Sequence, residues 1–301
     1  MFCDPVSGVC EIPGRVITDA TAINGLQSAE KPLKLIYFTD PICSTCWGIE
    51  PQWRRLKLEY GHVLDISYHM GGLLPGWDVY SSGGISGPSD VAHHWDEVSL
   101  HYQMPIDGNV WLEDPLPSSY PPSMWFKAAQ QQDKHSAVIF LRRMRELLFM
   151  EKQNICKPEP VLKSAAFAGL DMLRLQQDFD QQGKALFEAD LALGKQLGVR
   201  GFPSIFFIDQ SGRSELVYGA KPYQVFTTAL HKLLPEATAR TYAKNLELFT
   251  YFPTLTTKEY AVLNDLSFDT AALQLKGYQE ENKVWVNTIA SGQLWGLTGT
   301  L

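Results

Sequence analysis

A pair of cysteines, Cys43 and Cys46, stands at the point where a strand pattern changes into a helix pattern. The run before it, residues 33–38, is short and β-prone, and after it apolar residues recur at helical spacing as far as residue 56. Another β-prone run follows at residues 63–70. The order strand, helix, strand is typical of a βαβ unit with parallel strands, and it places the CxxC where the helix begins.

This placement of the two thiols indicates a chemistry. A thiol at the start of a helix meets unpaired backbone N–H groups and the positive end of the helix dipole, which lower a cysteine pKa from about 8.5 into a range of about 3.5–7.5. We therefore expect Cys43 to be the nucleophile, and Cys46, one turn deeper on the same face, to resolve a mixed disulfide. A structural zinc site would need a second ligand pair, which the spacing of the seven histidines does not offer. An inert pair of thiols is the remaining alternative.

A second motif, Gly-Val-Arg-Gly-Phe-Pro at residues 198–203, precedes the apolar run at 205–208. A proline there cannot donate to a strand ladder, so it belongs at an edge or a bend. We expect a cis peptide between Phe202 and Pro203 that leaves the preceding N–H and C=O groups for a substrate strand, with an ordinary trans turn as the alternative. Pro51 lies within the helix after the CxxC, where we expect it to kink the helix at a cost of about 3 kcal/mol.

The chain divides by pattern into five segments. An arm rich in turn-forming residues covers 1–30, and the two halves of one α/β domain cover 31–88 and 199–235. A mostly helical insertion, 89–198, separates the halves, and an extension covers 236–301. The periodicity predicts helices at 123–132, 135–150, 159–167, 170–181, 183–197 and 222–234, and a hairpin that joins 205–208 to 214–219.

The extension at 236–301 reads as helix, helix, hairpin, which is a winged-helix-like order. A capping-box pattern at 256–259 opens the first helix, the second is expected near 269–279, and the runs at 284–288 and 293–296 suit a hairpin. Its acidic residues outnumber its lysines, which argues against DNA binding, because phosphate contacts need a basic face. An interaction or dimerisation module and simple packing against the main domain are the two interpretations.

Charge and cysteine content limit the classes of partner and compartment. The 301 residues carry 26 Lys and Arg against 33 Asp and Glu, a net charge of −7, so the chain has no overall attraction for nucleic acid or anionic membranes. No apolar stretch approaches the roughly 18–20 residues that span a bilayer, and the N-terminus lacks the pattern of a signal peptide. Five cysteines are too few, and odd in number, for a disulfide-stapled secreted scaffold. We therefore expect a cytoplasmic protein.

Together these motifs resemble the DsbA branch of the thioredoxin superfamily. The resemblance rests on the strand–CxxC–helix junction, on Pro51 eight residues after Cys43, and on the 198–203 motif, and it covers about residues 30–235. It implies an α/β thioredoxin-like fold with a DsbA-type helical insertion and no organic cofactor. The position six before Cys43, often a buried carboxylate in this superfamily, is Tyr37, and Asp40 and Glu50 are the carboxylates near the motif.

Two subgroups of that branch are similar in more detail. Residues 40–43 and 198–203 look like the FrnE-type and 2-hydroxychromene-2-carboxylate-isomerase-like proteins. Nearly the full chain resembles the SpxH group, which are DsbA-like adaptors that deliver the regulator Spx to the ClpXP protease. That resemblance rests on Cys43-x-x-Cys46-Trp47 with Glu50-Pro51, on residues 107–111, 116–119 and 126–129, and on the extension ending near Trp295-Gly296.

The resemblance supports two hypotheses. In the first, the chain is an enzyme, a thiol-disulfide oxidoreductase that acts on a client protein or a small thiol or disulfide. Cys43, Cys46 and Pro203 would then form the catalytic site, with Phe202 and Trp47 binding the substrate. In the alternative, the chain is a non-enzymatic SpxH-like adaptor that delivers a client protein to ClpXP, and its dithiol is a sensor or a vestige.

The other three cysteines lie apart from the CxxC in the sequence. Cys3 and Cys10 stand in the arm, where three interpretations remain open: a second disulfide that exchanges with the CxxC, two zinc ligands, or two unpaired thiols. Cys156 has no partner in sequence and is expected to be a packed free thiol.

Overall fold

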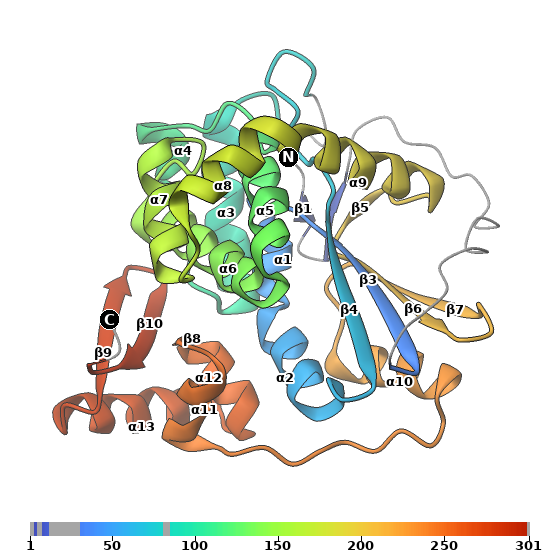
Figure 1. Ribbon diagram of the computed structural model, residues 1–301. Coiled ribbons are helices and arrows are strands. Elements are labelled where there is room, and N and C mark those ends of the chain that lie inside the picture. Colours follow the sequence, from blue (N-terminus) through green and yellow to red (C-terminus); the bar gives the residue numbers. More distant parts are fainter. Residues whose placement is uncertain (1–2, 5–7, 12–30, 81–84, 300–301) are drawn as a thin grey trace.

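A four-stranded mixed sheet lies at the centre of the molecule (Figure 1). The computed structural model describes residues 3–4, 8–11, 31–80 and 85–299. The strand order is β4-β3-β6-β7. β3 (Leu33–Thr39) pairs in parallel with β4 (Leu64–Met70) and antiparallel with β6 (Ser204–Asp209), which pairs in turn with β7 (Ser214–Tyr218). Nearly every side chain of β3 and β6 is buried, as expected for strands covered on both faces.

The predicted βαβ unit is confirmed, with one difference in its helix. α1 (Ser44–Gly48) and α2 (Glu50–Tyr60) join β3 to β4, and the chain changes direction between them at Ile49. Pro51 lies in the first turn of α2, where a backbone N–H has no partner within the helix. The helix that was expected to kink at Pro51 is thus divided at Ile49, two residues before the proline, while hydrogen bonds from the N–H of Ile49 to Thr45 and from that of Trp53 to Ile49 continue across the division.

The helical insertion follows β4 and covers one side of the sheet (Figure 1). All the predicted helices in this region are present. One difference is that the two expected at 170–181 and 183–197 join through a π-helical turn, η1 (Phe179–Gly183), in which Phe179 stacks on Trp125. The helices are α3 (Pro88–Tyr102), α4 (Val110–Glu113), α5 (Tyr120–Gln132), α6 (Lys134–Glu151), α7 (Pro158–Phe167), α8 (Met172–Asp178) and α9 (Lys184–Gln196).

The second half of the sheet domain ends in α10 (Tyr223–Leu233), and the chain then runs to a small α+β unit at the C-terminus. The capping box at Thr256 and Glu259 opens α12 (Thr257–Asn264), and the predicted hairpin is present as β9 (Val284–Ile289) and β10 (Gly292–Leu297). The sequence did not show β8 (Thr254–Thr256), which pairs with β10 and makes a three-stranded antiparallel sheet. The helices η2 (Asn245–Glu247), α11 (Leu248–Tyr251) and α13 (Phe268–Glu280) complete the unit, which has its own hydrophobic core.

A third sheet is formed by the N-terminal arm. β1 (Cys3–Asp4) pairs with β2 (Val9–Glu11), and β2 pairs antiparallel with β5 (Gly201–Phe202), the short strand just before Pro203. The rest of the predicted arm, 12–30, lies outside the described residues. Within the described ranges, no helix has the length and apolar character needed to cross a membrane.

Candidate functional site

The dithiol stands where the sequence placed it, at the end of β3 and the beginning of a helix. Cys43 is the N-cap of α1, and its Sγ accepts a hydrogen bond from the backbone N–H of Cys46 at 3.1 Å. Both cysteines are free thiols, and neither side chain has any exposed surface. The site is therefore formed but closed to solvent.

Burial reverses the predicted acidity of the two thiols. It raises the pKa of Cys43 well above its ordinary value, and the hydrogen bond between the Cys43 and Cys46 side chains acts in the same direction. Burial opposes ionisation of Cys46 too, but the hydrogen bond from Cys43 and the positive charge of Arg145 outweigh it, so the pKa of Cys46 is lowered. The prediction that Cys43 ionises readily is wrong, because the helix terminus does not compensate for the loss of solvent.

The charged group beside the dithiol is Arg145 of α6, which the sequence analysis missed. Its guanidinium is buried and donates to Glu50 Oε1 at 3.0 Å, to Thr39 Oγ1 at 2.6 Å and to the carbonyl oxygen of Asp40 at 3.1 Å. Its positive charge lowers the pKa of Cys46. No local pattern could have revealed this contact, because about 100 residues separate the arginine from the CxxC.

The two carboxylates near the motif make their hydrogen bonds away from Cys46. Glu50 is paired with Arg145 and with Arg54. Asp40 is fully buried, and its carboxylate accepts hydrogen bonds from the backbone N–H of Ile42 at 3.1 Å, from that of Leu73 at 2.8 Å and from Ser119 Oγ at 2.9 Å. Burial raises the pKa of Asp40 to about 6, although these hydrogen bonds hold it down. Asp40 therefore ties the CxxC loop to the segments after β4 and before α5.

Trp47 packs into the helical insertion. Its indole N–H donates to the carbonyl oxygen of Pro105 at 3.1 Å, Arg142 lies over its ring at 4.2 Å from the centroid, and Phe149 stacks on it at 5.4 Å. The side chain has no exposed surface. In this conformation the ring anchors α1 to the insertion, and its assignment to substrate binding stays a prediction.

The peptide between Phe202 and Pro203 is cis, as predicted. Phe202 is buried, and its ring fills the space beside Gly71, where an added Cβ would lie 1.7 Å from the ring. The backbone of Phe202 pairs with Cys10 of β2. The strand position that the sequence analysis reserved for a substrate is thus taken by the chain's own arm.

Cys10 lies directly against the dithiol. Its Sγ is 3.2 Å from Cys43 Sγ and 3.2 Å from Thr45 Oγ1, and the side chain is fully buried. Cys10 is half of a disulfide bond. Cys3 stands opposite Cys10 in the β1–β2 register. Of the three interpretations of the arm cysteines, two unpaired thiols is therefore excluded for Cys10.

Cys156 and the potential metal ligands of the described residues were the other candidates for a functional site. Cys156 is half-buried and donates to the carbonyl oxygen of Ser118 at 3.0 Å, and burial raises its pKa to about 12, so it is the packed thiol that was expected. Among the residues that the structure describes, no three His, Cys, Asp or Glu side chains come together as a group that could hold a metal ion.

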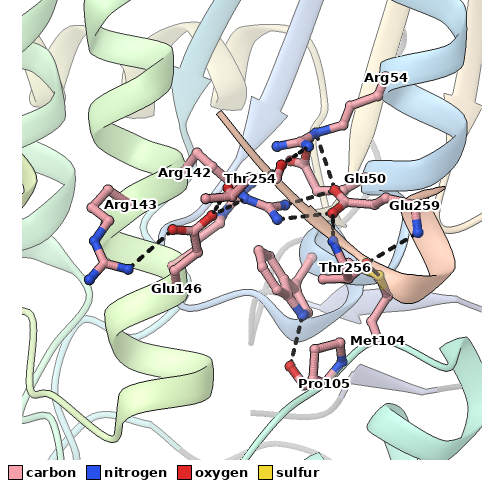
Figure 2. A network of polar contacts seen from close by, with 12 residues as sticks. Glu50, Arg54, Met104, Pro105, Arg142, Arg143, Glu146, Thr254, Thr256 and Glu259 are labelled. Atoms are coloured by element: carbon pink, nitrogen blue, oxygen red, sulfur yellow. Dashed lines mark hydrogen bonds and ion pairs between the residues drawn. The ribbon is translucent and has the colours of Figure 1, made fainter. Parts of the chain in front are cut away.

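A buried network of ion pairs joins the C-terminal unit to α2 of the sheet domain and to α6 of the insertion (Figure 2). Arg142 of α6 donates to both carboxylate oxygens of Glu259 at 2.8 and 2.9 Å and to Glu146 at 2.7 Å. Arg54 of α2 lies 3.1 Å from Glu259 and donates to the carbonyl oxygen of Thr254 at 2.7 Å, while the Thr254 hydroxyl donates to Glu146. All five side chains are buried. Since the partners come from α2, α6, β8 and α12, the network fixes the small unit on the larger one.

The described fold and site define a thioredoxin-like protein with a helical insertion, and the comparisons with known proteins agree. A family model described as Thioredoxin matches residues 37–228. The cytosolic disulfide reductase DsbM from Pseudomonas aeruginosa has a similar fold, with a TM-score of 0.53 and 23% identity over 66% of this chain and 99% of that one. At that identity the likeness shows the fold alone.

Relatives that match nearly the full length of the chain show to which group of thioredoxin-like proteins it belongs. The ClpXP adapter protein SpxH of Halalkalibacterium halodurans is 33% identical over 97% of this chain and 96% of its own length. The ClpXP adapter protein SpxH of Bacillus subtilis is 29% identical over 88% of this chain and 89% of its own length. The chain belongs to the thioredoxin family and, within it, to the family of the SpxH proteins.

These relatives overturn the first functional hypothesis. That hypothesis, a thiol-disulfide oxidoreductase and hence an enzyme, rests on the CxxC at a helix start, which is the usual reaction centre of this fold. The relatives that match nearly the full length are named adapter proteins. The reading as an oxidoreductase is therefore wrong, and the alternative reading as an adaptor has the support.

Proposed function

We propose that this protein is an adaptor that binds a client protein and delivers it to the ClpXP protease. The observation that carries the proposal is the similarity to the adapter SpxH over 97% of the chain, which includes the C-terminal unit beyond the thioredoxin match. The client we expect is a regulator of the Spx type, as the sequence resemblance implies. The cytoplasmic location expected from the sequence belongs to the same proposal.

We propose that the segments expected from the sequence have separate roles in binding and delivery. Residues 31–88 and 199–235, with the insertion 89–198, form the body, and residues 236–301 form a winged-helix-like docking unit. The buried network of Arg54, Arg142 and Glu259 supports this assignment, because it holds the docking unit in one orientation. A fixed orientation lets client and protease contacts on separate parts of the surface act together, since no ordering cost arises on binding.

The state of the dithiol also supports an adaptor. Cys43 and Cys46 are wholly buried, and the edge of β5 beside Pro203 is covered by β2. An external client strand has no free edge to pair with there. Delivery of the client is therefore expected not to depend on thiol chemistry.

A degradation assay with purified ClpXP and an Spx-type client tests the proposal. The full-length protein is expected to raise the initial rate of client loss roughly tenfold or more, since tethering raises the effective concentration of the client at the protease. The double variant Cys43→Ser with Cys46→Ser should keep that rate. A third arm uses Glu259→Gln, which leaves buried arginines without their partner and should loosen the docking unit and lower the rate.

The matched control is Glu281→Gln, which removes an exposed carboxylate of the same unit that pairs with Lys283. It should deliver the client like the wild type. Absence of any acceleration by the wild-type protein, when client and protease are each active, would contradict the adaptor role. Loss of delivery in the double cysteine variant would show that the dithiol takes part after all.

A further inference from the structure

The N-terminal arm occupies the edge of the fold beside the dithiol. β2 pairs antiparallel with β5, so that Cys10 faces Phe202 and Glu11 faces Gly201. A further hydrogen bond runs from the backbone N–H of Ala220 to the carbonyl oxygen of Gly8. The side chains of Val9 and Cys10 are buried. The arm is thus a seated strand with paired backbone groups on the body of the protein.

The surface that the arm covers, which we call its seat, includes Gly201 and Ala220, and there the backbones of arm and body lie very close together. A Cβ added to Gly201 would lie 2.4 Å from the carbonyl oxygen of Cys10 and 2.8 Å from Val9 Cγ1. Gly8, at φ +68°, would bring a Cβ to 2.6 Å from the carbonyl oxygen of Ala220. Glycine on both sides of the contact is therefore a condition for the arm to lie where it does.

This seat brings a free thiol against a disulfide. Cys43 Sγ lies 3.2 Å from Cys10 Sγ, and Cys10 is already disulfide-bonded. Cys43, Cys46 and Cys156 are free thiols, so none of these three is the disulfide partner of Cys10. A nucleophilic sulfur, the disulfide it would attack and a resolving thiol are assembled in one buried place.

We propose that the N-terminal arm is an internal substrate of the CxxC: the arm disulfide, the one that holds Cys10, exchanges with Cys43 and Cys46 and moves between the arm and the CxxC within a single chain. The inference does not rest on the adaptor role, because its site, its chemistry and its readout involve neither client nor protease. Under this proposal, the presence or absence of the arm disulfide depends on whether Cys43 and Cys46 are oxidised or reduced.

The exchange balances without any outside oxidant. The thiolate of Cys43 attacks Cys10 Sγ, so that a Cys43–Cys10 bond forms and the bond from Cys10 to its disulfide partner breaks, releasing that partner as a thiolate. The released thiolate takes the proton of Cys46, and Cys46 then attacks Cys43 Sγ and releases Cys10 as a thiolate. The CxxC loses two electrons and the arm gains them.

The Cys46→Ser variant traps the intermediate, because the resolving thiol is absent. Trypsin cuts after Arg15, Lys34 and Arg54, so the arm cysteines fall in peptide 1–15 and the CxxC in peptide 35–54. Protein is fully reduced, given one equivalent of oxidised glutathione, quenched in acid, alkylated and digested. The cross-linked pair of 1–15 with 35–54 should be roughly tenfold or more abundant in Cys46→Ser than in the wild type.

Two further variants separate docking from accidental cross-linking. Gly201→Ala in the Cys46→Ser background should lower the cross-linked pair roughly tenfold, because the new methyl group pushes the arm from its seat. Gly277→Ala, where an added Cβ meets nothing within 4 Å, should leave it unchanged. Circular dichroism establishes that each variant is folded, and repetition at two protein concentrations establishes that the reaction is intramolecular.

Two results would contradict the proposal. A Cys46→Ser protein whose arm disulfide stays intact, with no cross-link to peptide 35–54, would overturn the proposal. A cross-link that rises with protein concentration, or that survives Gly201→Ala unchanged, would show that the seated arm is not its source.

Discussion

The guanidinium group of Arg142 donates two hydrogen bonds, of 2.8 and 2.9 Å, to the carboxylate of Glu259, which lies 117 residues later in the sequence. Glu259 also accepts from the backbone N–H of Thr256 at 2.7 Å, so one carboxylate closes the capping box of α12 and receives the arginine of another unit. The start of α12 and the attachment of the C-terminal unit therefore depend on the same side chain.

Replacing Glu259 with Gln should lower the free energy of unfolding by about 3–5 kcal/mol, because it leaves Arg142 and Arg54 buried beside a neutral partner. Urea denaturation followed by circular dichroism measures this. Glu281→Gln is the control and should change the free energy by less than about 1 kcal/mol, as its carboxylate is exposed. A Glu259→Gln protein as stable as the control would show that the network contributes little to the fold.

Gly71→Ala should destabilise the protein by about 1–3 kcal/mol, because the added Cβ would overlap the ring of Phe202, which has no free space to move into. Gly277→Ala should instead stabilise α13 by about 0.5–1 kcal/mol, since nothing lies within 4 Å and alanine restricts the unfolded chain. Both values come from urea denaturation. Equal effects of the two substitutions would contradict the packing described around Phe202.

Cys43 in the wild-type protein should react with iodoacetamide at pH 7.5 roughly tenfold or more slowly than an exposed cysteine, because it is buried and its pKa is raised. Gly201→Ala should speed the reaction by uncovering the sulfur. Mass spectrometry of peptide 35–54 over time gives the rate. Rapid alkylation of the wild type would indicate that the arm does not cover the site.

Local patterns carried much of the fold. The strand and helix runs, the CxxC at their junction, the position of Pro203 and the capping box at Thr256 all depend on residues that are close in sequence. β8 escaped notice because three residues are too short for a periodicity, and the pairing with β10 that defines it spans about 40 positions. The division of the helix at Ile49 is local by contrast, because Pro51 has no N–H to donate to the carbonyl group of Trp47.

The site was predicted less well than the fold, for a physical reason. The sequence located the two thiols, but the pKa of Cys43 depends on burial and that of Cys46 also on the charge of Arg145. The segments that bury the thiols and that carry Arg145 are distant in the sequence. The contact of Cys10 with Cys43 follows from pairing of β2 with β5, about 190 residues apart. A helix terminus was the one influence visible locally, and it proved weaker than desolvation.

Asp40 gives the stability a pH dependence whose sign can be stated. Burial raises its pKa in the folded protein to about 6 from an ordinary value near 4, so the folded state holds the proton more tightly than the unfolded chain. The contribution of this group to the free energy of unfolding is therefore full below pH about 4 and is lost as the pH rises through 6, by about 3 kcal/mol in total.

Asp40→Asn lacks this change, so its stability relative to the wild type should increase by that amount between pH 4 and pH 7. Urea denaturation of both proteins across this range measures the difference, in which the other carboxylates cancel. A difference that stays constant with pH would mean that Asp40 ionises in the folded protein as it does in water.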